Sequence, residues 1–265
     1  MASDFEGKRA LVTGSSSGLG EEIARRLAAE GASVVVHGRD AARTEAVAKS
    51  VRDAGGDASV AIGDLATDEG ADAVAAAALA GGPVDILVNN VGVYDPSLSW
   101  TTVSAADWAD IYNVNVISGV RMIQRLVPAM RERGWGRVIQ ISSVTGHRPQ
   151  ASQPHYAATN AARSNLAVSL SRELRGTGVT SNAIAAGGIL VPNSVDHLVS
   201  MGREQGWGET WDEIEPNLVA ALGPNDVGRI GRMDEYVGMV LFLAGPASGY
   251  VTGANLHVDG GWRDA

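Results

Sequence analysis

Cysteine is absent from the 265-residue sequence. Its absence excludes disulfide bonds, thiolate nucleophiles and metal sites built on cysteine, and we expect no bound metal. A basic excess is also missing, because 30 Asp and Glu residues outnumber 21 Lys and Arg residues and give a net charge of -9. Nucleic acids and anionic membranes recruit basic faces. Neither is therefore an expected partner, and the expected partner is a small molecule.

Long apolar runs are missing as well. The amino terminus, "MASDFEGKRALVTG", has no charged segment followed by an apolar stretch, and the most apolar segments are Ala-rich and shorter than a membrane span. We therefore expect a soluble cytoplasmic protein. No Pro/Ser-rich linker or block of charge divides the chain, so a single domain over residues 1–265 is expected.

Short β-branched runs alternate with longer stretches of helical length. The runs are "RALVTG", "SVVVHG", "ASVAIG", "VDILVNN", "GRVIQISS" and "VTSNAIAA". Such alternation predicts an α/β fold with a Rossmann-type, doubly wound parallel sheet and helices on both faces. From about residue 190 to about residue 229 the alternation stops, and Gly, Pro, Trp and acidic residues dominate. An insertion of this kind predicts a small substrate lid.

A glycine-rich turn follows the first run. The segment "LVTGSSSGLGEEIARRLAAEG" leads from a strand into a helix through Gly14, Gly18 and Gly20. Glycines there permit a tight turn and let backbone N–H groups and the helix N-terminus approach a pyrophosphate. The spacing G-x3-G-x-G differs from the common G-x-G-x-x-G form, and a glycine-rich turn without a ligand is the alternative. The position directly after the first strand favours a nucleotide.

The end of the second run distinguishes NAD from NADP. In dinucleotide folds an acidic residue there binds the ribose hydroxyls and selects NAD, whereas a small residue with an arginine nearby admits a 2′-phosphate. The segment "VVVHGRD" has Gly38 and Arg39 at these positions. NADP(H) is therefore expected to be preferred over NAD(H). The alternative is that Arg39 is a solvated cation and Asp40 takes the ribose contact.

Two later segments extend the predicted nucleotide site. Asp64, in "GDLATDEG", follows the third run, where it could accept a hydrogen bond from the adenine amine; the alternative role is to cap or break the strand end. The segment "NNVG", Asn89 to Gly92, follows the fourth run. Small residues there allow close passage of a cofactor, and the alternative is that the asparagines only hold loops together.

The order and spacing of these motifs resemble the classical short-chain dehydrogenase/reductase family. "TGSSSGLG", "NNVG", "VNV" at 114–116, "ISS" at 141–143, Tyr156 and "YVTGANLHVDGG" follow one another in family order. The resemblance implies an NADP(H)-dependent ketoreductase or alcohol dehydrogenase that moves a hydride between a nicotinamide and a carbonyl or carbinol carbon. It also implies a homotetramer or homodimer assembled through helices at 107–126 and 156–174.

The resemblance assigns roles to individual residues. It makes Tyr156 the proton donor in reduction, places Ser143 on the substrate oxygen, and matches Asn115 to the asparagine that holds a proton-relay water. A fixed hydroxyl donor and a proton source lower the barrier as charge grows on the carbonyl oxygen. The residues expected to bind the cofactor are Gly14, Ser16, Ser17, Gly18, Leu19, Gly20, Gly38, Arg39, Asp64, Leu65, Asn90, Gly92, Tyr156, Asn160, Gly187 and Ile189.

The catalytic lysine of the family is missing. The family has Y-x-x-x-K, whereas this chain has "YAATN", which places Asn160 one helical turn after Tyr156. Asparagine keeps a donor and an acceptor for the ribose hydroxyls, but it supplies no charge to stabilise a tyrosine anion. Arg163 and His155 are the nearby candidates for a replacement cation. A solvated helix arginine and a loop histidine are the simpler interpretations of these two residues.

Two further departures lie close to Asn160 in the predicted site. The usual proline-glycine after the sixth run is Ala186-Gly187, and the threonine that often meets the nicotinamide carboxamide is Val191. Together they favour an alternative function, in which the fold binds nucleotide but has lost efficient redox activity and serves as a non-redox lyase, an isomerase or a binding protein. The aromatic residues proposed as pocket walls for a partly apolar ketone are Tyr94, Trp100, Trp207 and Trp211.

Overall fold

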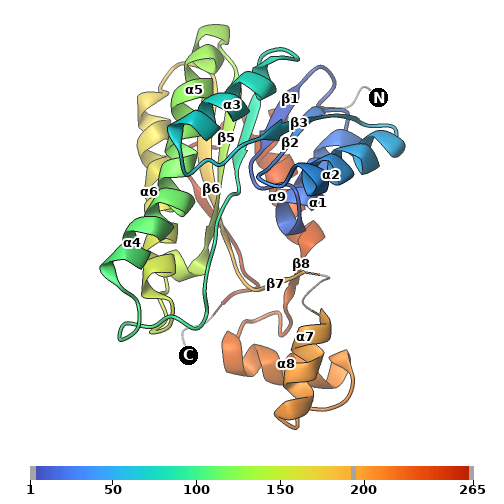
Figure 1. Cartoon of the computed structure of the whole chain (residues 1–265), viewed down its shortest axis with the longest axis vertical. Helices are drawn as coiled ribbons and strands as arrows, with labels where there is room; N and C mark the ends of the chain where they lie inside the picture. Colours follow the sequence, from blue (N-terminus) through green and yellow to red (C-terminus); the bar gives the residue numbers. More distant parts are fainter. Residues whose placement is uncertain (1–3, 192–194, 263–265) are drawn as a thin grey trace.

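A computed structural model describes residues 4–191 and 195–262 of the chain. It confirms the predicted doubly wound architecture, because seven parallel strands form one sheet in the order β3-β2-β1-β4-β5-β6-β9 with helices on both faces (Figure 1). The strands are β1 (Arg9–Val12), β2 (Ser33–Gly38), β3 (Asp57–Ile62), β4 (Ile86–Asn89), β5 (Gly136–Ser143), β6 (Val179–Ala186) and β9 (Asn255–Val258). Five of the first six strands lie within the runs read from the sequence, and β3 begins one residue before its run, at Asp57.

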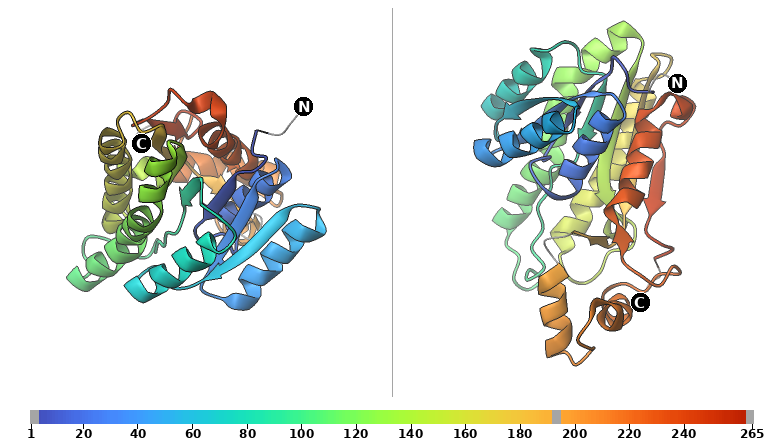
Figure 2. Two further views of the ribbon diagram at one scale, coloured as in Figure 1. Left: turned by 90° about the horizontal axis from the view of Figure 1, so that it is seen from above. Right: turned by 90° about the vertical axis from the view of Figure 1, so that its right-hand side faces the viewer.

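The helices divide between the two faces of the sheet. Helices α1, α2 and α9 cover one face, and α3, α5 and α6 cover the other (Figures 1 and 2). The helices are α1 (Gly18–Ala29), α2 (Ala41–Asp53), α3 (Asp68–Leu79), α4 (Ala105–Tyr112), α5 (Ser118–Arg133), α6 (Pro154–Glu173), α7 (Val195–Glu204), α8 (Trp211–Leu222) and α9 (Met233–Ala244). A π-helix, η1 (Asn113–Ile117), joins α4 to α5, and short 3-10 helices occupy η2 (Val144–Gly146) and η4 (Pro246–Ser248).

Two hydrophobic cores lie on the two faces of the sheet. Val12 of β1 packs with Ile23 of α1 in one core, and the neighbouring Leu11 packs with Val74 of α3 in the other. All four side chains are fully buried. Successive side chains of a strand point to opposite faces, so an apolar run without polar alternation is what a strand buried on both faces requires. The cores fix the strand ends on which the site is built.

The segment between β6 and α9 differs from the rest of the fold. Helices α7 and α8 project beyond the body of the sheet (Figures 1 and 2). They are connected to it through two short parallel strands, β7 (Ile189–Leu190) and β8 (Gly231–Arg232). The sequence predicted neither strand, because two residues are too few to show a period of two. The use of this segment, about 190–229, as a substrate lid stays a prediction.

The starts of α2, α3 and α4 have side-chain caps. The Asp40 carboxylate accepts from the Arg43 N–H at the start of α2, and the Thr67 hydroxyl accepts from the Gly70 N–H at the start of α3. Helix α1 is an exception that matters for the site, because Ser17 makes no side-chain capping bond there. Within the described parts of the chain, we find no helix with the length and apolarity needed to span a membrane.

Candidate functional site

A cleft opens at the carboxyl ends of β1 and β4, where the strand order changes direction. Strands β2 and β3 lie on one side of β1, and β4, β5 and β6 lie on the other. Ligands of open α/β sheets bind at such a point. The cleft encloses about 1830 Å³ of empty space, including its mouth. Every residue predicted to bind the cofactor lines it, as do Ser143 and Tyr156, whereas Asn115 does not.

The glycine loop forms one wall of this cleft and is shaped for a close ligand. Gly14 and Gly18 have positive φ angles of 66° and 60°, which favour glycine. A Cβ on Gly20 would lie 2.5 Å from both the Gly14 carbonyl oxygen and the Asn90 side-chain amide. Because Ser17 leaves the start of α1 uncapped, N–H groups of its first turn remain available to an anion. These features fit a dinucleotide pyrophosphate.

A buried histidine, which sequence reasoning missed, holds the glycine loop in place. Nδ1 of His37 accepts a hydrogen bond from the Gly14 N–H at 2.8 Å, and Nε2 lies 3.2 Å from the Gly63 carbonyl oxygen. Nδ1 must therefore be unprotonated, with the ring proton on Nε2. Burial lowers the pKa of His37 to about 4, against a smaller raising effect of the Gly63 hydrogen bond. His37 is thus neutral at neutral pH.

The end of β2 has no room for an acidic side chain. A Cβ on Gly38 would lie 2.3 Å from the Thr44 hydroxyl and 2.8 Å from Ser16. Asp40 caps α2 instead of lining the cleft, which argues against its predicted alternative role on the ribose. Arg39 lines the cleft with a side chain that is 72% exposed.

A second arginine joins Arg39 in the cleft. Arg43, in the first turn of α2, also lines it and was not predicted. The sequence contained a signal for Arg43. It follows Arg39 by four residues and lies in the first turn of the helix that begins after Arg39. Asp64 lies 3.9 Å from Arg39 and accepts from the Ala66 N–H, so its alternative capping role is also observed.

The loop after β4 forms the floor of the cleft. The Asn90 side chain donates to the carbonyl oxygens of Thr13 and Gly14 at 3.0 and 3.2 Å, so it holds the two loops together while lining the cleft. Gly92 follows it, and Leu65 lines the same cleft although it is 2% exposed. The structure therefore shows the loop-joining role of Asn90, and that role is compatible with a ligand above it.

Tyr156 and Ser143 lie at the far end of the same cleft. Tyr156 is in the first turn of α6, as predicted, and Ser143 is the last residue of β5. The Ser143 hydroxyl accepts from Thr145, and it is half-buried. The preceding Ser142 is buried and donates to the Asn160 carbonyl oxygen at 2.9 Å. Of the two serines, Ser143 is therefore the one with the more accessible hydroxyl.

Asn160 lines the cleft but its side chain turns back on its own helix. Its amide Nδ2 donates to the Tyr156 carbonyl oxygen at 2.9 Å. The residue is 2% exposed. The bond uses one of the two amide N–H groups and leaves the side-chain oxygen as an acceptor. Whether Asn160 meets a ribose stays a prediction.

Asn115 lies in the π-helix between α4 and α5. Its side chain accepts from the Val93 N–H at 2.8 Å and donates to the Val93 carbonyl oxygen at 2.9 Å. It also donates to the Thr159 hydroxyl at 3.3 Å. The side chain therefore fixes the loop after β4 against α6. Single-turn π-helices frequently occur at functional sites, and the predicted link to a relay water stays a prediction.

The interpretation of Arg163 as a solvated helix residue is wrong. Arg163 is 6% exposed and lines the cleft. Its Nε and Nη1 donate to the backbone carbonyl oxygens of Asn115 and Ile141, each at 2.5 Å, and its Nη2 donates to that of Val91. Burial lowers the pKa of Arg163 to about 10, and the charge of Tyr156 acts in the opposite direction. Arg163 is therefore a buried cation at neutral pH.

The interpretation of His155 as a loop residue is also wrong. His155 lies in the first turn of α6 and is 3% exposed. Its ring centroid lies 6.0 Å from that of Trp108, and its Nδ1 has no hydrogen-bond partner among the described residues. It does not line the cleft.

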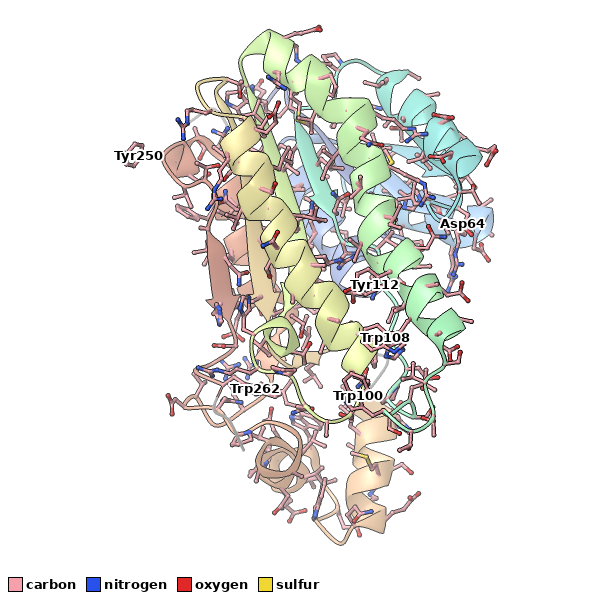
Figure 3. All side chains as sticks on the ribbon, turned by 90° about the vertical axis from the view of Figure 1, so that its left-hand side faces the viewer. Asp64, Trp100, Trp108, Tyr112, Tyr250 and Trp262 are labelled. Carbon is pink, nitrogen blue, oxygen red and sulfur yellow. The ribbon has the colours of Figure 1, made fainter. Side chains whose placement is uncertain are left out.

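Of the four aromatic residues proposed as pocket walls, only Tyr94 lines the cleft. Its ring centroid lies 5.8 Å from that of Tyr156. Trp100 is 67% exposed and packs on Trp108 with centroids 5.8 Å apart (Figure 3). Trp207 and Trp211, in the α7–α8 segment, do not line this cleft.

Comparison with known proteins agrees with this architecture. The family model described as short chain dehydrogenase matches residues 8–198. The short-chain reductase protein NovJ of Streptomyces niveus is 37% identical over 95% of this chain and 92% of its own. A 3-oxoacyl (acyl-carrier-protein) reductase of Agrobacterium tumefaciens, solved with NADP bound, is 36% identical with a TM-score of 0.86, covering 97% of this chain and 95% of its own. L-Sorbose reductase of Gluconobacter frateurii, solved with NADPH and L-sorbose, is 30% identical with a TM-score of 0.89, covering 98% of each chain.

Proposed function

The chain belongs to the short-chain dehydrogenase family, and from that premise we propose that it is an NADP(H)-dependent oxidoreductase that interconverts a ketone and a secondary alcohol. One observation carries the proposal. The glycine loop, which fits a pyrophosphate, opens into the same cleft as the hydroxyl-bearing residues Ser143 and Tyr156. A cleft of this kind brings a bound dinucleotide and a proton donor to one substrate.

The hydroxyl groups of Tyr156 and Ser143 carry the proton chemistry. Reduction of a carbonyl requires two electrons, which the bound dinucleotide supplies as a hydride to carbon, and one proton on oxygen. Tyr156 breaks its O–H bond and gives that proton to the substrate oxygen, and it regains a proton from solvent afterwards. Ser143 donates a hydrogen bond to the same oxygen, where negative charge grows. The reverse reaction uses the same groups, with the Tyr156 anion as the base.

The adenine half of the cleft favours NADP(H). Gly38 places no acidic side chain where it would repel a 2′-phosphate, and Arg39 and Arg43 line the cleft beside it. Arginine recognises phosphate through paired N–H donors. The two similar reductases solved with NADP and with NADPH are consistent with this preference. Binding of NAD(H) is expected to be weaker.

The substrate end of the cleft favours a small to medium, partly apolar ketone. Its walls include Tyr94, Val93, Val114, Ile189 and Val191. Apolar walls with a few placed polar groups are typical of small-molecule sites. Acidic residues outnumber basic residues in α7 and α8, which disfavours strongly anionic substrates.

We also propose that the chain is cytoplasmic and acts as a homotetramer or homodimer. The helical segments α4 to α5 and α6 are the proposed interface. Ile117, on the π-helix between α4 and α5, is 42% exposed, which is consistent with an apolar contact there. Light scattering at micromolar concentration tests this proposal, and a monomer would contradict it.

NADPH binding and turnover test the proposed function in sequence. Fluorescence titration should show tighter binding of NADPH than of NADH, and a panel of small ketones should then include substrates on which NADPH is oxidised. If NADPH binds and no ketone of the panel is reduced, the reductase proposal is wrong. Asn160, Ala186 and Val191, which depart from the family pattern, then favour the rival function, a lyase, an isomerase or a binding protein without efficient redox activity.

A further inference from the structure

Arg163 is a buried cation without an ion-pair partner. It is 6% exposed, and in the described ranges 4–191 and 195–262 no Asp or Glu forms an ion pair with it. Burying an uncompensated charge is strongly unfavourable, and proteins normally pair such a charge or replace it. A merely apolar position on α6 would not require an arginine. We therefore expect the charge of Arg163 to have a function in the cleft that Arg163 lines.

Three separate elements fix the position of the guanidinium. It donates to the carbonyl oxygens of Val91 after β4, Ile141 in β5 and Asn115 in the π-helix. A Cβ on Gly92 would lie 3.5 Å from Nη1, so the guanidinium packs directly against the glycine at the floor of the cleft. Three of the five N–H donors are used by these carbonyls. Hydrogen bonds to three elements hold the guanidinium at one position in the cleft.

Tyr156 and Arg163 lie two turns apart on α6. They are seven residues apart, which places both on one face of the helix. The charge of Tyr156 raises the pKa of Arg163, although the larger effect of burial lowers it. Both side chains line the same cleft, so a cation at Arg163 and an anion at Tyr156 would attract each other there. Asn160, between the two, is neutral and bonded to the Tyr156 carbonyl.

Other titratable groups do not supply this charge. Tyr94, after β4, lies against Tyr156, and His155 precedes Tyr156 on α6. Asp95 and Asp107 interact electrostatically with His155. The ring of His155 packs on Trp108, outside the cleft. Strands β5, β6 and β7 contribute no titratable side chain to the cleft lining. Of the three arginines that line the cleft, Arg39 and Arg43 belong to its other half, at β2 and α2.

We infer that Arg163 replaces the missing lysine of the family by stabilising, from two turns away, the anion that Tyr156 forms when it releases its proton. Arg163 acts through Tyr156 and is a positioning residue rather than a catalytic one. Its contribution to turnover rests on the proposed reductase function. Its effect on Tyr156 does not, because ionisation of the phenol needs neither substrate nor dinucleotide.

A pH titration of the full chain tests the inference. Ultraviolet difference absorbance records formation of tyrosine anions, and subtraction of the curve of Tyr156→Phe isolates the contribution of Tyr156. Arg163→Gln keeps a hydrogen-bond donor but loses the charge, and it should move the midpoint of this contribution upward by about one pH unit. Turnover of a ketone should fall by about tenfold in parallel. Circular dichroism and the Kd for NADPH check that the variant is folded.

Two variants separate charge from hydrogen bonding. Arg163→Lys keeps the charge but cannot reach all three carbonyls, so its midpoint should remain within about half a pH unit of the unmodified protein. Adding Asn160→Lys to Arg163→Gln should restore the midpoint, because it returns a cation one turn from Tyr156. An unchanged midpoint in folded Arg163→Gln, or equal upward shifts in the Gln and Lys variants, would overturn the inference. If Arg163→Gln does not fold, a rise of about one full unit in Arg163→Lys overturns it.

The titration and the ketone panel can fail independently. A shifted midpoint without turnover of any ketone would leave the role of Arg163 intact and remove the reductase function. Turnover of a ketone together with an unshifted midpoint in Arg163→Gln would leave the reductase function intact and remove the role of Arg163. The two outcomes therefore identify which proposal is wrong.

Discussion

The two halves of the cleft recognise ligands by different means. At β1 and β2 the site consists mainly of backbone: glycines with positive φ, an uncapped helix start and a loop held by His37. At β5 and α6 it consists of side chains, namely Tyr156, Ser143, Asn160 and Arg163. The glycine loop of the first half matches the motifs on which the family resemblance rests, whereas the second half has Asn160 where the resemblance implies a lysine. A backbone cradle depends on glycines at fixed positions, whereas a charge can reach one point in space from several positions of the chain.

Because a charge can come from several positions, the neutral Asn160 does not by itself exclude proton transfer by Tyr156 in the side-chain half of the cleft. The lysine that the resemblance implies would supply a charge near the tyrosine, and a charge acts over several ångströms without a fixed contact. Arg163, one turn after Asn160, is a long side chain whose guanidinium is held by carbonyls from three other elements. The glycine loop has no such freedom, because a Cβ at Gly20 would overlap backbone atoms of Gly14.

The largest expected effect concerns the side-chain half. Tyr156→Phe removes the proton donor, and general acid catalysis contributes about 10² to 10⁴-fold to rate, so steady-state reduction of a ketone should fall by that factor. The Kd for NADPH should change little, because the backbone half is untouched. The matched control is Tyr250→Phe, since Tyr250 is fully exposed and lies outside the cleft (Figure 3). Full turnover in Tyr156→Phe would make Tyr156 structural.

The second prediction concerns pH and the backbone half. The folded pKa of His37 is about 4, below the value near 6.5 of an exposed histidine. The unfolded chain therefore binds the proton more readily, and stability that is present above about pH 6.5 is lost as the pH falls towards 4, by up to roughly 3 kcal/mol. His37→Asn keeps an acceptor for Gly14 but does not titrate.

Denaturant unfolding at a series of pH values measures this effect. The free energy of unfolding of His37→Asn should depend less steeply on pH between about 6.5 and 4 than that of the unmodified chain. His257→Asn serves as the control, because His257 is exposed and lies outside the cleft. Equal slopes for the unmodified chain and His37→Asn would contradict the burial of a neutral His37.

Sequence reasoning succeeded where neighbouring residues determine the structure. The six β-branched runs became strands because their apolar residues suit a sheet covered on both faces, and of these six strands only β3, at the sheet edge, has exposed residues. The glycines after β1 marked the turn before α1. It failed for His37, to which it gave no role, and for Arg163, which it interpreted as a solvated cation. Their partners, Gly63 for the first and Val91, Ile141 and Asn115 for the second, are far away in the chain. Which carbonyls a long side chain reaches is decided by the tertiary fold.

The third prediction compares the same substitution at two helical glycines. In Gly20→Ala the new Cβ would lie 2.5 Å from the Gly14 carbonyl oxygen, so thermal unfolding should show destabilisation by about 1–3 kcal/mol and NADPH binding should weaken. Gly238, inside α9, has no atom within 4 Å of the position that a Cβ would take, and Gly238→Ala should stabilise the helix by about 1 kcal/mol. Equal effects of both changes would show that the glycine loop tolerates a side chain.

The smallest expected effect tests how the backbone half selects its dinucleotide. Arg39→Ala should raise the Kd for NADPH by about tenfold, because an arginine-phosphate contact at an exposed site contributes on the order of 1 kcal/mol or slightly more, and the Kd for NADH should stay constant. Arg43→Ala should act in the same direction. Lys49→Ala is the control, since Lys49 lies on α2, pairs with Asp53 and is outside the cleft. Fluorescence titration with both nucleotides measures the dissociation constants of each variant. Because Arg39 and Arg43 flank Gly38 from a strand end and a helix start, the double variant should lose the preference for NADPH over NADH, whereas equal losses for the two nucleotides would assign both arginines to general binding.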